Sequence, residues 1–449
     1  MRIIRRSRTA IGIDVGTRNI KAAQLCRSDG QYHIVALALL PRVSSSIVHR
    51  GSSDEARGMS DEGRAWQVDP QEILSLRRFL RRQGFYGNDV VLAVPDEKLL
   101  RGILELPGRV SGAAIRQMAR MELSRLHHVA PDSFELVHWE LASADKSAVR
   151  LADKSKPTTQ TLAFGCPHDV ANAFLDAFEE AGLNVTALDV RSAAAARACL
   201  PLTTPPASSG RKTGAGVTCL LDLQWNSTKL LLVWGHTLIY EKFISNQCIA
   251  TLTVRLSEKF GLPERFAYQI VRAVGLPPPP FLLPKEARGQ GGAAGTACDS
   301  KGSELDQKSV VAIREMLMSH FDTVTEELKS PLAYASQQYP DKGIERILLI
   351  GDGAGILGIS QYLADNLGIE VMLAAPSDLV SSSIVQWHGH PLDFARDRPG
   401  RVHGPEARAP EGRAWPVLTK SGNPDLTVAV GLAQFTARPG KGRGHSGGG

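Results

Sequence analysis

Two stretches of the chain that lie 208 residues apart look like copies of one strand–turn–strand unit. In the first copy, an apolar run leads into Asp14-Val15-Gly16, and Lys21 stands at the start of a second apolar run. In the second copy, Asp222 and Lys229 hold the equivalent positions, but Gln224 replaces the glycine. A duplicated hairpin predicts two similar domains that face one cleft, where the two turns would grip a phosphate group from both sides.

The first turn carries groups that suit a phosphate site. Gly16 lets backbone N–H groups approach phosphate oxygens, Thr17 and Asn19 add side-chain donors, and Lys21 adds positive charge. Asp14 is a candidate ligand, directly or through water, for a metal ion beside the phosphates. The alternative interpretation is an ordinary hairpin turn, because Asp-x-Gly sequences are common in turns.

The second turn keeps the aspartate and the lysine but changes the residues between them. Gln224 and Trp225 are bulky where a phosphate needs bare backbone. The flanking apolar runs are intact, so we expect the fold to survive here while the ligand contact is lost.

A glycine-rich turn follows a third apolar run at residues 347–350. Gly351 and Gly353 stand between this predicted strand and a predicted helix. Such a turn can present backbone amides and the positive end of a helix to an anion or to a nucleoside. A simple tight corner between strand and helix is the alternative interpretation.

Composition indicates an ordinary soluble globular protein of roughly two to four domains. The 449 residues are 43% apolar and 22% charged, and the net charge of +6 favours a solvated surface over nucleic-acid binding. The six cysteines form no CxxC pair, which is typical of core residues in a reducing compartment. We expect neither a transmembrane helix nor a secretory signal, because no apolar run reaches about 18 residues and the basic start lacks an apolar core.

Strand-like runs alternate with helical runs of 10–20 residues, which predicts an α/β protein. The early hairpin in each half favours mixed rather than all-parallel sheets. We expect the polar or Gly/Pro-rich segments to be loops, a connection between domains at 202–216, and a tail. The expected loops are residues 41–67, 142–157, 276–303 and 386–421.

In their order and spacing, these elements resemble the actin-like ATPase superfamily, and within it the PilM family of type IV pilus assembly proteins. Residues 12–25 are similar to the opening of that family. Residues 92–95 and 103–107 resemble the start of its small insert subdomain, and residues 118–140 resemble the helix and strand of that insert. Residues 187–190, 367–371 and 428–433 also fit the family pattern.

The resemblance implies an actin-like (ribonuclease H-like) duplicated fold with two lobes around a nucleotide cleft. The implied division is a basic arm (1–9), a first subdomain (10–94 and 158–203), an insert subdomain (95–157), a second subdomain (204–245 and 344–436), an upper part of the second lobe (246–343) and a tail (437–449). It implies ATP and Mg as cofactors. The implied nucleotide-binding residues are Asp14, Gly16, Thr17, Asn19, Lys21, Asp222, Gly351 and Gly353, with Asp14 near the metal.

The family also implies a partner. The insert subdomain of PilM proteins binds the cytoplasmic tail of the inner-membrane protein PilN, which places the protein in the cytoplasm at the inner membrane. We therefore expect a PilN-like partner, with Arg116, Arg120 and Glu122 as candidate contact residues. A solvated helix face is the alternative interpretation of these charges. Self-association is compatible with the resemblance.

Departures from the family pattern weaken the nucleotide site. The family usually has a glycine where Gln224 stands, a glycine pair where Ser245-Asn246-Gln247 stands, and charged adenosine contacts where Tyr268 and Val271 stand. Two or three lost contacts, at about 1–3 kcal/mol each, lower ATP affinity by orders of magnitude.

These departures make a scaffold with a degenerate nucleotide site the leading interpretation. We expect no catalytic residues. An ATP-dependent switch or ATPase of the same fold is the second interpretation. A sugar kinase is the third, and Asp189 is its one candidate for a catalytic base.

Overall fold

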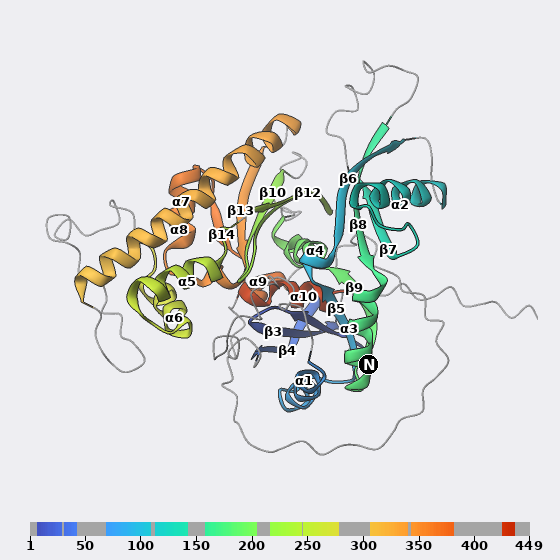
Figure 1. Cartoon of the computed structure of the whole chain (residues 1–449), viewed down its shortest axis with the longest axis horizontal. Helices are drawn as coiled ribbons and strands as arrows, with labels where there is room; N and C mark the ends of the chain where they lie inside the picture. Colours follow the sequence, from blue (N-terminus) through green and yellow to red (C-terminus); the bar gives the residue numbers. More distant parts are fainter. Residues whose placement is uncertain are drawn as a thin grey trace, which may run out of the picture.

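The computed structural model describes residues 7–28, 31–42, 69–108, 113–141, 158–203, 216–244, 246–277, 306–339, 343–380 and 424–435. These residues form two lobes and a small sheet (Figure 1). Three of the expected segments lie outside the described residues: the loops at 142–157 and 386–421, and the tail at 437–449. Most of the loops expected at 41–67 and 276–303 lies outside them too.

The first lobe is built on a mixed sheet in which β4, β3, β2, β5 and β9 lie in that order. Strands β2, β3 and β4 are antiparallel neighbours, whereas β5 and β9 run parallel to β2. A short β1 pairs with β3 and makes this a six-stranded sheet. The strands are β1 (Ser7–Arg8), β2 (Ile11–Val15), β3 (Asn19–Ser28), β4 (Gln31–Pro41), β5 (Asp89–Val94) and β9 (Asn184–Val190).

The second lobe repeats this sheet, in the order β12, β11, β10, β13 and β14. Its strands are β10 (Val217–Leu223), β11 (Thr228–Trp234), β12 (Thr237–Ile244), β13 (Ile344–Ile350) and β14 (Val371–Leu373). Asp14 lies opposite Lys21 in the first hairpin, and Asp222 lies opposite Lys229 in the second. The two hairpins therefore share one register, which confirms the duplicated fold predicted from the repeat.

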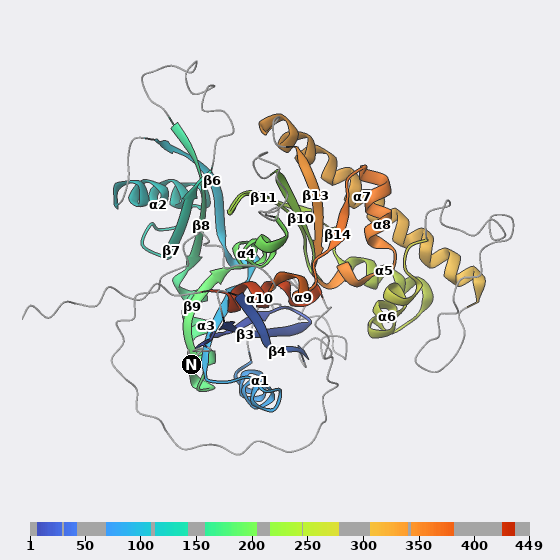
Figure 2. The ribbon, with the colours of Figure 1, turned by 180° about the vertical axis from the view of Figure 1, so that it is seen from behind.

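A small sheet in the order β6, β8, β7 stands beside the first lobe (Figure 2). Its elements are β6 (Leu100–Pro107), β7 (Phe134–Glu140), β8 (Thr158–Pro167) and the covering helix α2 (Ala113–His127). Leu104, Leu123 and Phe134 form part of a separate apolar core between α2 and the sheet. We assigned residues 158–203 to the first subdomain, but β8 pairs with both β6 and β7 and so belongs to this sheet.

Helices cover the sheets of both lobes, and their local sequences explain where they start. In α1, for example, Asp69 accepts a hydrogen bond from the Gln71 N–H, Pro70 opens the helix, and Ile73 and Leu76 lie on its buried face. The other helices are α3 (His168–Glu180), α4 (Arg191–Thr203), α5 (Ile249–Phe260), α6 (Glu264–Val274), α7 (Gln307–Gln338), α8 (Ile359–Leu367) and α9 (Pro376–Leu379), and α1 spans Pro70–Arg82. Within the described ranges, no helix is both long enough and apolar enough to span a membrane.

Helix α10 (Thr427–Ala433) packs on the first lobe, although we expected residues 344–436 in the second subdomain. It lies against α4, β2 and β3 (Figure 1). The contacts are close enough to require glycine: a Cβ added at Gly431 would lie 1.8 Å from the Ala194 carbonyl oxygen, and one added at Gly12 would lie 2.2 Å from that of Ala429.

Candidate functional site

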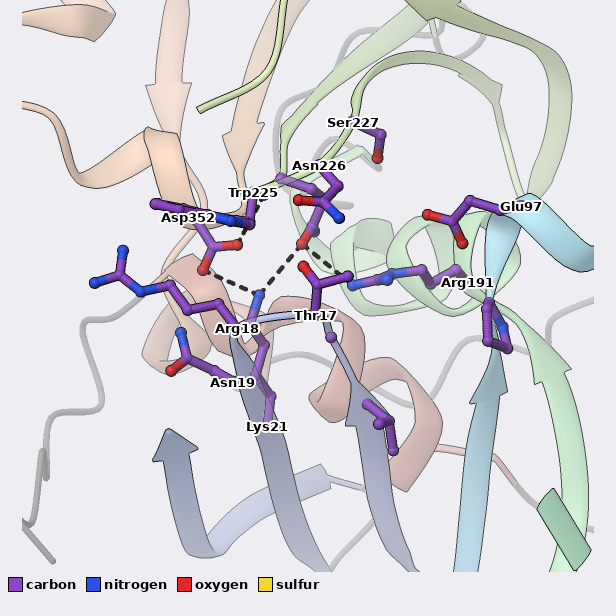
Figure 3. A pocket seen from close by; sticks show the side chains of 14 residues that line it. Thr17, Arg18, Asn19, Lys21, Glu97, Arg191, Trp225, Asn226, Ser227 and Asp352 are labelled. Carbon is purple, nitrogen blue, oxygen red and sulfur yellow. Dashed lines mark hydrogen bonds and ion pairs between the residues drawn. The ribbon is translucent and has the colours of Figure 1, made fainter. Parts of the chain in front are cut away.

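The two predicted turns face each other across one pocket between the lobes (Figure 3). Each turn closes with the same backbone hydrogen bond: the Gly16 N–H donates to the Asn19 carbonyl, and the Gln224 N–H donates to that of Ser227, both at 2.9 Å. The turns are therefore structural copies as well as sequence copies.

The pocket is small because side chains fill it. Its cavity volume is about 30 Å³, enough for about one water molecule. Ligand sites for small molecules usually have volumes of about 300–1,000 Å³. Its lining residues are Val15, Gly16, Thr17, Arg18, Asn19, Lys21, Pro95, Glu97, Arg191, Gln224, Trp225, Asn226, Ser227 and Asp352.

Gln224 lies at the centre of the hydrogen bonds between the lobes. Its Oε1 accepts from Lys21 Nζ and from an Arg191 guanidinium nitrogen, both at 3.2 Å. Its Nε2 donates to Asp222 Oδ1 at 2.5 Å. The residue that replaces the glycine of the first turn thus occupies the space that the glycine would leave open.

Arg191, the first residue of α4, supplies a cation that the sequence did not reveal as part of the site. Its guanidinium lies 2.7 Å from Asp14 Oδ2. Burial acts to lower the pKa of Arg191, but the carboxylates of Asp14, Asp96 and Asp222 outweigh it and raise the pKa. Asp14, the expected metal ligand, is therefore paired with an arginine in this structure.

The carboxylate expected to hold a metal ion already has a cationic partner. Among the residues that the structure describes, no group of three or more His, Cys, Asp or Glu side chains is arranged to hold one. The guanidinium of Arg191 already neutralises the carboxylate of Asp14. The cavity of about 30 Å³ has room for a nucleotide only if these side chains move.

Lys21 joins the first hairpin to the glycine-rich turn of the second lobe. Its Nζ lies 3.3 Å from Asp352 Oδ1, and the other carboxylate oxygen of Asp352 accepts the Trp225 N–H at 3.0 Å. In Figure 3, Lys21 and Asp352 point toward each other. Burial acts to lower the pKa of Lys21, but Asp352, Asp425 and Asp14 together raise it. Lys21 is therefore a charged, paired lysine.

Arg18 fills the side of the pocket next to α6. Its guanidinium carbon lies 4.0 Å from the ring centroid of Tyr268 and 4.4 Å from that of Trp225. The two rings meet edge to face at 5.2 Å, and the Tyr268 hydroxyl donates to the Asp352 carbonyl at 3.2 Å. Burial lowers the pKa of Arg18. The two aromatic residues thus support an arginine in the cleft.

Lys229, the counterpart of Lys21, is buried below the pocket and does not line it. Its Nζ lies 2.7 Å from Asp96 Oδ2, 3.2 Å from Ser192 Oγ and 3.9 Å from Asp222 Oδ2. Burial acts to lower the pKa of Lys229, but Asp96, Asp222 and Glu241 raise it. This second lysine therefore makes a structural ion pair between the lobes, with Asp96.

The remaining residues predicted at the cleft have structural contacts as well. A Cβ added at Gly351, where φ is +88°, would lie 2.7 Å from Asp222 Oδ1, and one added at Gly353 would meet Ile249 at 2.5 Å. Asp189, the candidate base, is 2% exposed and pairs with Arg197 at 2.8 Å. The cleft therefore gathers the predicted turn residues, but it offers no general base from Asp189.

The candidate partner-binding residues lie on α2 and differ in exposure. Arg120 donates to the carbonyls of Pro131 and Phe134 at 2.8 and 2.5 Å, so it supports the local fold. Arg116 has a side chain that is 50% exposed and lies 3.6 Å from Glu135. Glu122 pairs with Arg125 at 2.9 Å on the outer face of the helix. Of these candidates, Arg116 and Glu122 are accessible.

Comparison of sequences identifies no relative: no protein-family model matches the chain, and no curated protein matches it. The structure is informative, because two lobes with the same sheet order, joined at paired hairpins, define an actin-like fold.

A particular PilM structure shares this fold. The PilM–PilN type IV pilus biogenesis complex matches with a TM-score of 0.60 and 17% identity, over 95% of this chain and 97% of that chain. The PilM-like fold expected from the sequence is therefore confirmed. Two other matches are the ethanolamine utilization protein EutJ from Carboxydothermus hydrogenoformans (TM-score 0.41, 12% identity, 96% of this chain and 90% of that chain) and MreB5 of Spiroplasma citri bound to AMPPNP (0.42, 13%, 83% and 92%).

Proposed function

We propose that the protein is an actin-like scaffold of a type IV pilus assembly machine, or of a related secretion machine, and that its nucleotide site is degenerate. In this proposal it acts in the cytoplasm at the inner membrane, where it binds the cytoplasmic tail of a PilN-like membrane protein. The observation that carries the proposal is the cleft, in which the protein's own side chains leave a cavity of about 30 Å³.

The contents of the cleft favour a scaffold over an ATPase. Gln224 and Arg191 bond to each other between the two turns, and Arg18 lies against Trp225 and Tyr268. A nucleotide would have to displace these buried groups and break their hydrogen bonds, at a cost of about 1–3 kcal/mol for each buried group left without a partner.

Calorimetry with Mg-ATP tests the degenerate site. We expect no measurable binding and negligible hydrolysis, and no rise in melting temperature on addition of Mg-ATP. Binding with micromolar affinity would contradict the proposal and favour the ATP-dependent switch. In that case Asp14, Gly16, Thr17, Asn19, Lys21, Asp222, Gly351 and Gly353 would be the contact residues, and Asp14→Ala and Lys21→Ala should abolish binding.

The small sheet and α2 are our proposed docking site for the partner's tail. Short peptides bind such subdomains in a groove or along a strand edge. Helix α2 carries accessible charge at Arg116 and exposed apolar side chains at Met121 and Leu126, which are 50% and 53% exposed. A tail with acidic and apolar residues fits this surface.

A charge reversal at one accessible residue tests the docking site. We expect Arg116→Glu to weaken binding of a fluorescent PilN-like tail peptide by about 1 kcal/mol, or roughly fivefold. Lys329→Glu is the matched control, because this lysine is a 57% exposed cation on α7 of the second lobe. Equal effects of the two variants would contradict this surface. Arg120 is less suitable for the test, because its carbonyl contacts make it part of the local fold.

A further inference from the structure

We propose that Gln224, Arg191, Lys21 and Asp352 form a built-in clasp that holds the two lobes together, so that the cleft stays closed without any ligand. This inference rests on the proposed function, in which the site binds no nucleotide. It gives the reason why a nucleotide is not needed to close the cleft. In Figure 3, Lys21 and Arg191 approach from the first lobe, and Asp352 lies on the second.

Three of the clasp's contacts cross directly between the lobes. Gln224, on the second lobe, accepts hydrogen bonds from Lys21 and from Arg191 of the first lobe at 3.2 Å. Lys21 also pairs with Asp352 of the second lobe at 3.3 Å. Their side chains are at most 11% exposed, and Gln224 is 5% exposed. Hydrogen bonds to charged donors in such a setting are the stronger kind.

The duplication explains why only one turn makes the clasp. The first turn has Gly16 at the position of Gln224, so this position supplies no side chain that could act as the shared acceptor. The substitution at position 224 therefore has two effects: it fills the space for a phosphate, and it supplies the acceptor that both cations share. Gln224 therefore both fills the phosphate space and bridges the two lobes.

Each clasp cation also has a carboxylate partner. Arg191 pairs with Asp14 at 2.7 Å, and Lys21 pairs with Asp352. Removal of either cation would leave a buried carboxylate without compensation, which destabilises a protein strongly. Gln224 is neutral, so its removal opens the bridge without removing a charge. Asp222 loses the hydrogen bond from Gln224 but keeps its ion pair with Lys229 at 3.9 Å. Gln224 is therefore the residue to substitute in a test of the clasp.

A second layer of interlobe contacts lies below the clasp. Lys229 reaches Asp96 and Ser192 of the first lobe, at 2.7 and 3.2 Å, and Ser192 donates to Glu241 of the second at 2.7 Å. These contacts remain when Gln224 is replaced. We therefore expect loss of the clasp to loosen the two turns locally while the lobes stay associated, and the measurement must report on the turns.

Amide hydrogen exchange of the full chain supplies this measurement. In Gln224→Ala, we expect exchange to rise by about 10-fold or more in peptides covering both turns, at residues 15–19 and 224–227, because the lost bonds to charged donors are worth about 1.5–3 kcal/mol each. The rise in the first turn is the critical result, since that turn is unchanged in sequence and lies in the other lobe.

Gln24 offers a matched control. It is a glutamine that is 1% exposed, and its side chain bonds to the backbone of Thr9 and Tyr86 within the first lobe. We expect Gln24→Ala to raise exchange near those residues and to leave residues 224–227 unchanged. If Gln224→Ala does not fold, Gln224→Leu replaces it, because leucine retains side-chain volume but cannot make the hydrogen bonds. We expect the same rise in amide exchange in both turns.

The inference and the proposed function fail in different experiments. If exchange in the first turn is the same in wild type, Gln224→Ala and Gln224→Leu, the clasp is refuted, even when no nucleotide binds. If the wild type binds Mg-ATP with micromolar affinity, the degenerate site is refuted, whatever the exchange result. Raised exchange in both turns together with no nucleotide binding supports both.

Discussion

Gly431 is the position where one added methyl group should perturb the first lobe most. A Cβ there would lie 1.8 Å from the carbonyl oxygen of Ala194 and 2.6 Å from its carbonyl carbon. Ordinary contact begins at 3.4 Å, so α10 and α4 would have to separate by about 1.6 Å. Both obstacles are backbone atoms, and no change of rotamer relieves the contact.

Helix α10 cannot move away from α4, because its other side already contacts β2. A Cβ at Gly12 would lie 2.2 Å from the Ala429 carbonyl oxygen. Overpacking of this kind costs about 1–3 kcal/mol and more in rigid places, while alanine gains about 1 kcal/mol over glycine in a helix. Because the obstacle at 1.8 Å is backbone, we expect a cost of about 3 kcal/mol or more. Gly431→Ala should therefore lower the free energy of unfolding by about 2 kcal/mol or more.

Chemical denaturation of wild type and variant measures this loss. Gly355→Ala is the matched control, since its Cβ would meet Nη2 of Arg272 at 2.7 Å, and the end of a long side chain can move away. A Gly431→Ala variant within about 0.5 kcal/mol of wild type would refute the reasoning, because it would show that α4 and α10 separate freely. Helix α4 begins at Arg191, so the same shift should raise amide exchange at the cleft.

The remaining predictions concern the small sheet, the second lobe and the thiols. Trp139→Phe should lower the free energy of unfolding by about 1 kcal/mol, because Trp139 Nε1 donates to the Leu238 carbonyl across the two parts at 2.9 Å; an unchanged denaturation midpoint would contradict this bridge. Burial lowers the pKa of His320 from 6.5 to about 4, so the folded state binds fewer protons than the unfolded state in this range. The free energy of unfolding should therefore fall by about 3 kcal/mol as pH falls from 6.5 to 4. Denaturation curves should show the difference in this free energy between wild type and His320→Leu changing by the same amount. Burial raises the pKa of Cys219 and Cys166 to about 12, so mass spectrometry should find both unmodified by iodoacetamide at pH 8 in the folded protein and modified in urea.

The sequence predicts the duplicated hairpins because register is a local property. Once an Asp and a Lys sit seven residues apart around a tight turn, pairing them fixes the rest of the two strands. The pairs Asp14–Lys21 and Asp222–Lys229 follow directly. The sequence also identified Gln224 as the bulky residue in the second turn, since bulk at that point does not depend on distant contacts.

The sequence did not predict what Gln224 bonds to. Its partners at positions 21 and 191 are distant in the chain, and Arg191 follows a strand with no motif to mark it. A similar limit explains the two misplaced elements. The polar residues 142–157 look like a domain boundary, yet β8 returns to the small sheet after them. The assignment of α10 depends on the close contact of Gly431 with α4, which no local pattern encodes.

The position of α10 has a consequence for how the chain folds. The first lobe is closed by residues from opposite ends of the sequence: α10 covers β2 and β3, and the Tyr32 hydroxyl donates to the Gln434 carbonyl at 3.3 Å, across 402 residues. During synthesis, the first lobe emerges from the ribosome before α10. It therefore lacks the helix that covers one face of its core until nearly the entire second lobe has been translated. Contacts of such sequence separation form slowly, and the exposed apolar surface invites aggregation or chaperone binding in the meantime. The first lobe therefore cannot complete its core before the second lobe has been synthesised.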